Sequence, residues 1–225
     1  DTFTVAHKSA CDMAITTIGK QFHAGSVHRG GINAIIKMAK IILALNDKFA
    51  KRLPQKTHEL FPEGPQIAAG TTIKGGTAIN VIPDSCALTF RCMVIPYQHT
   101  KEDLLNAVES IIDDLKREDP ELKVETTRFD FYTGDNVPED ERIVKVLRKA
   151  AVEAIGVEPK PWGVPFIGMS TYLNNIAKIP TIVYGCGSTE FNNTHAPNEW
   201  IYVDDLTKVT KVYCLVAMNY LGYET

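Results

Sequence analysis

The chain has 225 residues, of which 44% are apolar, 23% charged and 8% aromatic, a profile that excludes disordered and collagen-like proteins. Its 24 Lys and Arg residues against 27 Asp and Glu residues give a net charge of -3, so there is no general basic field for nucleic acid. No apolar run approaches the roughly 18 to 20 residues that span a membrane. We expect a soluble protein that binds neither nucleic acid nor membrane.

The five cysteines are an odd number without C-x-x-C spacing, so the sequence suggests neither a disulfide framework nor a thiolate zinc site. They are Cys11, Cys86, Cys92, Cys186 and Cys214. A reducing, cytoplasmic compartment fits this pattern best.

The first half of the chain alternates strands with helices. Phe3 and Val5 alternate with threonines as in a half-buried strand, and with neither an initiator Met nor a signal peptide we expect the chain to begin inside an element. A strand follows over 11–20, and apolar residues at helical spacing over 32–49 predict a helix that Pro54 closes.

Residues 66–73 and 87–95 predict two strands separated by a turn-rich segment. A second helix should start near Thr100, with acidic residues in its first turn, and another strand should follow over 124–131. The order strand, helix, strand, strand, helix, strand is that of the ferredoxin-like unit, which places both helices on one face of an antiparallel sheet.

After Asp135 the pattern changes to short strands between helices, which indicates an α/β layer. The expected elements are a helix over 143–151, a short strand around Phe166, a helix after Ser170, a buried strand over 180–184 and a helix over 205–221.

Three clusters of Gly, His, Asn and hydroxyl residues lie outside the periodic segments, over 19–34, 75–83 and 185–200. Taken alone, His23 before a glycine turn is more often a loop histidine, and Asn80 a turn residue that tolerates a left-handed backbone. His195 lies shortly past the carboxyl end of the predicted buried strand, where α/β sheets place ligand sites.

In this order and spacing, the clusters resemble a family of co-catalytic zinc amidohydrolases and exopeptidases. The family includes acetylornithine deacetylase, succinyl-diaminopimelate desuccinylase, aminoacylase and carboxypeptidase G. The motifs are G-K-x-x-H-A-G with G-I-N-A-I, N-x-I-P, G-x-S, and G-x-G with H-A-P-N-E. The resemblance spans nearly the whole chain.

The resemblance implies an α/β protein with an α+β lid. Residues 1–11 would end a catalytic-domain segment at a hinge, and 12–130 would form a ferredoxin-like βαββαβ lid or dimerisation domain. Residues 131–225 would form the C-terminal part of an α/β zinc-exopeptidase catalytic domain. A homodimer through the lid is implied as well.

The resemblance also implies roles for single residues. His195 resembles a metal ligand, and Glu199 would orient its loop. His23 resembles the catalytic lid histidine that donates to the oxyanion in the partner subunit's active site. Asn80 and Arg91 resemble lid residues near the substrate's carboxylate end, which suits the forked donors of arginine.

Gly168, Ser170, Gly185 and Gly187 resemble backbone-rich loops that cradle the substrate. Thr171 departs from the pattern, because many relatives have Asp after G-x-S, and this leaves the subfamily open.

The implied cofactor is Zn²⁺, two ions per active site, with Co²⁺ or Mn²⁺ as alternatives. Family members hold these ions with a His-x-Asp motif, a bridging Asp and a Glu-Glu pair, all of which would precede Asp1, so we expect the printed chain alone to be inactive. The expected substrates are N-acyl amino acids or small peptides, whose amide bond is cleaved by a metal-activated water.

The alternative is a truncated, non-catalytic dimerisation module of the same fold. The DNA upstream of the Asp1 codon would discriminate between the two: an in-frame stretch with carboxylate-rich motifs supports the enzyme, and a start codon there supports the module. In either case, residues from Asp135 onward would expose apolar faces, so we expect the printed chain to aggregate or dimerise.

Overall fold

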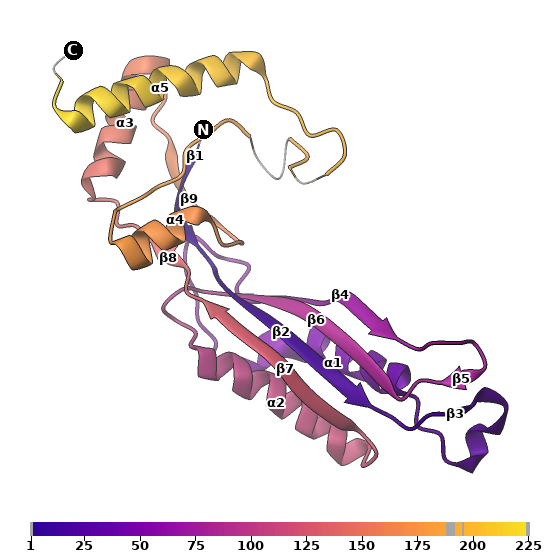
Figure 1. Cartoon of the computed structure of the whole chain (residues 1–225). Helices are drawn as coiled ribbons and strands as arrows, with labels where there is room; N and C mark the ends of the chain where they lie inside the picture. Colours follow the sequence, from indigo (N-terminus) through magenta and orange to yellow (C-terminus); the bar gives the residue numbers. More distant parts are fainter. Residues whose placement is uncertain (1, 188–191, 195, 224–225) are drawn as a thin grey trace. The chain divides into compact units, whose positions relative to one another are not determined.

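The computed structural model describes residues 2–187, 192–194 and 196–223 (Figure 1). The chain forms two compact units. Unit 1 contains Asp1–His7, Asp135–Val164 and Gly168–Thr225, and unit 2 contains Lys8–Gly134 and Pro165–Ile167. Within the described residues, no helix is long and apolar enough to cross a membrane.

Unit 2 is an antiparallel four-stranded sheet in the order β4-β6-β2-β7, with two helices on one face (Figure 1). The strands are β2 (Ser9–Ile18), β4 (Gln66–Gly75), β6 (Ser85–Val94) and β7 (Lys123–Tyr132), and the helices are α1 (Ala34–Arg52) and α2 (Lys101–Glu118). This is the ferredoxin-like βαββαβ arrangement, so the fold prediction is confirmed.

Alternation along the strands creates the core of unit 2. Cys11, Met13 and Ile15 of β2 are fully buried with apolar residues of both helices, while the residues between them are only partly buried. Burial of this set supplies the main stabilisation of the unit, at roughly 25 cal/mol per Å² of apolar surface.

Unit 1 contains a three-stranded sheet in the order β8-β1-β9, in which β1 runs parallel to β9 and antiparallel to β8. Its elements are β1 (Thr2–His7), β8 (Asp135–Asn136), α3 (Arg142–Ile155), β9 (Lys160–Val164), α4 (Met169–Tyr172), the π-helical turn η2 (Leu173–Ala177) and α5 (Val203–Leu221). Helix α3 packs against α5. Unit 1 thus combines strands and helices, as predicted.

Two strand predictions for the chain after Asp135 were wrong. The short strand ends at Val164 instead of including Phe166, because its neighbour β1 ends at His7, the residue that pairs with Val164. Residues 180–184 are neither a regular strand nor a buried one: only Val183 bridges to Thr4, and its side chain is 46% exposed.

The reason lies in where the backbone groups of Thr181 find their partners. Its N–H donates to Oδ1 of Asn174 at 2.7 Å, and its carbonyl accepts from Nδ2 of the same side chain at 2.9 Å. A side-chain amide therefore replaces a neighbouring strand at this position.

Candidate functional site

The first two motif clusters meet in unit 2. Strand β3 (Phe22–His23) pairs antiparallel with β5 (Val81–Ile82), and the Ala24 N–H donates to the carbonyl of Asn80 at 2.9 Å. The two site residues predicted for these clusters, His23 and Asn80, are thus adjacent, and both are exposed.

Glycines allow this close approach. A Cβ at Gly19 would lie 2.2 Å from the carbonyl oxygen of Ile32, and one at Gly31 would lie 2.5 Å from Cδ1 of Ile82. Gly19 and Gly31, one from each half of the first motif, are therefore packing requirements of the β3–β5 region.

The ring of His23 has a defined hydrogen bond. Its Nδ1 accepts from the Gly25 N–H at 3.1 Å in the 3-10 helix η1 (Ala24–Arg29) that follows β3. An accepting Nδ1 carries no proton, so Nε2 of the neutral ring carries it. The exposed imidazole can then donate through Nε2 to an anionic oxygen.

Arg91 lies elsewhere in unit 2. It is on β6, six residues or about 20 Å of strand beyond Ser85, the first residue of that strand. Its guanidinium forms a bidentate pair with Asp12, with Nε to Oδ1 at 2.6 Å and Nη2 to Oδ2 at 2.7 Å. The structure does not bring Arg91 to His23 and Asn80.

That ion pair has an electrostatic signature. The hydrogen bond from Arg91 lowers the pKa of Asp12 below its ordinary value of 3.8, and the same bond raises the pKa of Arg91. The pair links the two central strands, in which Asp12 and Arg91 are directly opposite each other.

The remaining described site residues belong to unit 1. Gly168 is the N-cap of α4, and Ser170 is buried with its Oγ 3.4 Å from both ring nitrogens of His7. Gly185 and Gly187 follow the 180–184 segment, and the φ of Gly187 is +136°, which side-chain-bearing residues rarely adopt. Their predicted contact with substrate stays a prediction.

His195 lies outside the described residues, so its predicted role as a metal ligand stays a prediction. Glu199 is described and exposed. Among the residues that the structure describes, no three His, Cys, Asp or Glu side chains come together as a metal site. The described residues therefore do not form a zinc cage by themselves.

Sequence reasoning missed a buried pair in unit 1. Nδ1 of His7 lies 2.8 Å from Oδ1 of Asp135, and the two residues are 128 positions apart. Neither residue stands in a recognisable motif. The available signal is positional, because His7 ends a predicted strand and Asp135 stands where the sequence pattern changes to short strands between helices.

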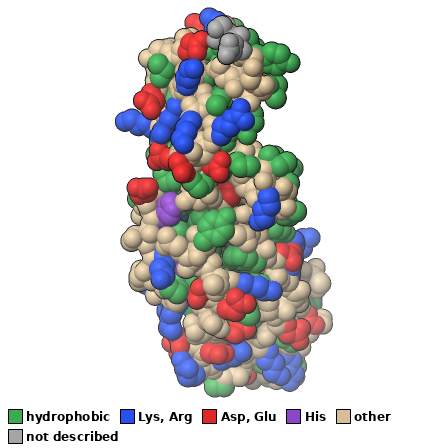
Figure 2. All heavy atoms as spheres, turned by 90° about the vertical axis from the view of Figure 1, so that its left-hand side faces the viewer, with side chains coloured by type: hydrophobic (Ala, Val, Ile, Leu, Met, Phe, Trp, Pro, Cys, Tyr) green, Lys and Arg blue, Asp and Glu red, His purple; other side chains and the backbone are tan. Residues whose placement is uncertain are grey.

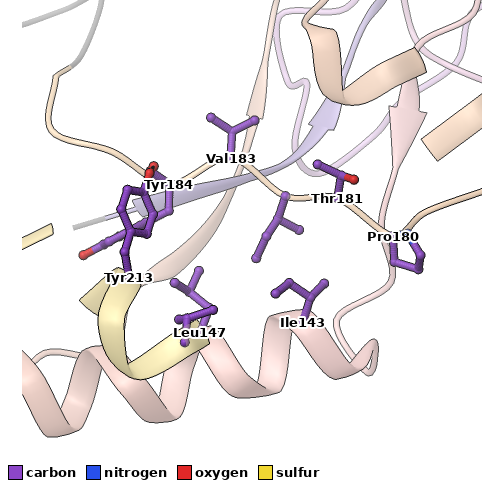
Figure 3. A pocket seen from close by; sticks show the side chains of 9 residues that line it. Ile143, Leu147, Pro180, Thr181, Val183, Tyr184 and Tyr213 are labelled. Atoms are coloured by element: carbon purple, nitrogen blue, oxygen red, sulfur yellow. Dashed lines mark hydrogen bonds between the residues drawn. The ribbon is translucent and has the colours of Figure 1, made fainter. Parts of the chain in front are cut away.

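An apolar pocket of about 310 Å³ is also present in unit 1 (Figure 3). Figure 3 shows Ile143 and Leu147 of α3 below it, the 180–184 segment above it and Tyr213 of α5 at one side. The Tyr213 hydroxyl donates to the carbonyl of Tyr184. The pocket thus lies beneath the segment that leads into Gly185.

The buried thiols of unit 2 are poor candidates for nucleophiles. Burial raises the pKa of Cys11 to about 12, and it also raises the pKa of the cross-strand neighbour Cys92. These thiols stay protonated and belong to the core.

Comparison with known proteins identifies the fold's relatives. The model of the peptidase dimerisation domain of M20 proteins matches residues 5–120, more than half of the chain. The chain belongs to this M20 family. The match covers most of unit 2, including β3, β5 and His23.

Relatives of this M20 chain include metallohydrolases, which implies a metal cofactor in the family. An uncharacterized metallohydrolase of Methanococcus maripaludis is 26% identical over 225 residues, covering 93% of this chain and 52% of the relative. The N-formyl-4-amino-5-aminomethyl-2-methylpyrimidine deformylase of Bacillus subtilis is 26% identical over 218 residues, covering 85% of this chain and 49% of the relative. The chain spans about half the length of these curated relatives.

Solved structures share the fold. The dipeptidase Dug1p of Saccharomyces cerevisiae superposes with a TM-score of 0.76 at 13% identity, covering 97% of this chain and 56% of that one. A tripeptidase of Staphylococcus aureus gives a TM-score of 0.70 at 22% identity, covering 96% of this chain and 52% of the tripeptidase chain.

Proposed function

We propose that this M20 chain acts in a metal-dependent hydrolase that cleaves an amide or peptide bond in N-acyl amino acids or small peptides. Metallohydrolases among the sequence relatives support the reaction class. The observation that carries the proposal is the exposed imidazole of His23, whose protonated Nε2 is set by the Gly25 N–H and which lies beside Asn80.

In this proposal His23 is the catalytic donor. Attack on an amide carbonyl turns its oxygen into an oxyanion, and a donor aimed at that oxygen stabilises the transition state more than the substrate. Asn80 would bind the polar end of the substrate. Arg91 is not part of the proposed site, because Asp12 occupies its guanidinium.

The proposed metal is zinc, two ions per active site, with cobalt or manganese as substitutes. His195 would be one ligand. The described residues do not complete the ligand set.

We further propose a homodimer formed by the border of unit 2 where α1 runs along the edge strand β4. Ile35 of α1 lies over Gly75 of β4, since a Cβ at that glycine would approach Ile35 to 3.1 Å. On the same helix, Ile36 is 56% exposed and Leu43 is 71% exposed. An open strand edge beside exposed apolar side chains is suited to a two-fold interface.

The test is an assay of the product of the complete reading frame, loaded with zinc, against N-acyl amino acids and dipeptides. We expect hydrolysis of at least one class, and a fall in kcat of about 10²- to 10³-fold for His23→Ala. His28→Ala is the matched control, because His28 is an exposed histidine of the same η1 helix. No hydrolysis of any substrate would reject the proposal.

The second candidate is a non-catalytic dimerisation module. The observation in its favour is that the family match is to a dimerisation domain. A stable dimer of the complete product without hydrolase activity would favour this candidate.

A further inference from the structure

A buried polar network in unit 1 joins segments that are far apart in the sequence. Oδ1 of Asp135 contacts Nδ1 of His7 at 2.8 Å, and Oδ2 accepts from Nδ2 of Asn174 at 2.6 Å. His7 is 3% exposed and Asp135 is 1% exposed. A carboxyl group this deeply buried is tolerated because both of its oxygens have partners.

Asn174 extends the network to the 180–184 segment. Its amide both donates to and accepts from the backbone of Thr181, while it also donates to Asp135. Thr181 lies four residues before Gly185. Asn174 belongs to the π-helical turn η2, a distortion that is often found at functional sites.

His7 extends the network in the other direction. Its ring lies against the G-x-S segment, with Ser170 Oγ 3.4 Å from both nitrogens, and a Cβ at Gly168 would lie 2.8 Å from Nε2. The carbonyl of Gly168 accepts from the N–H of Thr171 at 3.1 Å and from its hydroxyl at 2.6 Å. The His7 ring therefore leaves no room for a side chain at Gly168.

We propose that His7, Asp135 and Asn174 are positioning residues that hold the Gly168–Ser170 segment and the stem of the Gly185–Gly187 loop in fixed register. The role of these two segments in substrate binding rests on the proposed function, whereas the coupling between them rests on the network alone. Segments ordered before binding lose less conformational freedom when a ligand arrives, which favours affinity.

Asn174→Asp tests the network with little change in size. The variant loses both Nδ2 donations and places a carboxylate beside Asp135 and the Thr181 carbonyl. Amide hydrogen exchange is measured in the product of the complete reading frame. We expect exchange to rise at least about tenfold at both Thr181 and Thr171, with β2 and β6 unchanged.

Asn106→Asp is the matched control, because Asn106 is exposed on α2 in unit 2 and the change is chemically identical. This control should leave the exchange rates of the Thr181 and Thr171 amides within about twofold of the wild-type rates. Acceleration at Thr181 alone, with Thr171 unchanged, would overturn the proposal, since it would show only a local effect of losing the donation from residue 174 to the Thr181 carbonyl.

Gly168→Ala probes the network from the opposite end. Its Cβ displaces the His7 ring, and because coupling is reciprocal we expect faster exchange at Thr181. The double variant Asp135→Asn with Asn174→Asp again pairs an amide with a carboxylate, so it should recover part of the protection. The inference is contradicted if Gly168→Ala leaves the exchange rate of the Thr181 amide unchanged. It is also contradicted if the double variant loses as much protection as the two single variants added together. Neither result depends on metal or substrate, so failure of the proposed hydrolase activity is separately detectable.

Discussion

At the scale of single residues, the proton on His23 is the feature most open to measurement. Because Nδ1 accepts from the Gly25 N–H, we predict that ¹⁵N NMR of the neutral ring shows the proton on Nε2, to a greater extent than for His28. Gly25→Pro removes the donor and should reduce that preference, while His28 reports in the same spectrum on the integrity of η1. A protonated Nδ1 in the wild-type chain would exclude the proposed donor geometry.

Asp12 and Arg91 yield a prediction about pH. The folded-state pKa of Asp12 is lowered, so its contribution to stability is present above the ordinary value of 3.8 and is lost as the pH falls through the lower folded value. We expect Asp12→Asn to destabilise unit 2 by less than about 1 kcal/mol at pH 7, since the pair is partly exposed. Urea titrations at a series of pH values measure the free energy of unfolding of wild type and of Asp12→Asn. The two free energies should become equal below the folded-state pKa of Asp12. A difference that persists at the lowest pH would contradict the ion-pair explanation.

Residues that stand in motifs could be predicted from the sequence, whereas residues whose role depends on strand pairing could not. His23 and Asn80 could be singled out because each stands in a motif, and the structure places them together. The partner of Arg91 follows from strand register, which the sequence alone leaves open. His7 and Asp135 carry no local signal, because their significance arises only when β1 pairs with β8.

At the scale of elements, α2 offers a direct test of helix capping. The Oγ1 of Thr100 accepts from the Asp103 N–H at 3.1 Å, and the Asp103 carboxylate accepts from the Thr100 N–H at 2.8 Å. We expect Thr100→Ala to lower the free energy of unfolding by about 1 kcal/mol, and Thr100→Ser to retain most of it. Urea denaturation measures both, and equal losses in the two variants would argue against the cap.

The α1–β4 border predicts how the dimer responds to mutation. A buried carboxylate without a partner is costly, so Leu43→Glu should weaken a homodimer formed there by at least about tenfold. Asn106→Glu on α2 introduces the same side chain away from this border and should leave association unchanged. Analytical ultracentrifugation of the product of the complete reading frame compares the two variants, and an undiminished dimer in Leu43→Glu would place the interface elsewhere.

Long periodic elements could be predicted from the sequence, and short ones could not. The helices begin within a few residues of their expected starts because apolar spacing and the Thr100 cap are local signals. The 180–184 segment has the composition of a strand, but the side chain of Asn174 takes the hydrogen bonds of Thr181. Tertiary contacts of this kind override composition.

At the scale of the whole molecule, charge is mixed and apolar surface is plentiful. Figure 2 shows basic and acidic side chains interspersed on the face it draws, with hydrophobic side chains exposed between them. In unit 1, large apolar side chains are strongly exposed on several elements, among them Met169 (77%), Ile176 (74%) and Val203 (76%). Surface of this kind favours association.

We therefore predict that the 225-residue chain binds a hydrophobic dye and forms oligomers or aggregates that Leu43→Glu alone does not abolish. Dye fluorescence and size-exclusion chromatography check this, with a complete monomeric globular protein of similar size as the reference. Monodisperse monomer with high thermal stability and no dye binding would contradict the prediction.

The interleaving of the two units bears on biosynthesis. Strand β1 must wait for β9, which leaves the ribosome more than 150 residues later, because the two are hydrogen-bonded neighbours. Nearly all of unit 2 emerges between them as one uninterrupted stretch, Lys8–Gly134. Since domains generally fold as they are synthesised, the inserted unit can mature first, and the nascent β1 must remain unpaired until translation delivers first β8 and then β9, its two neighbours in the sheet.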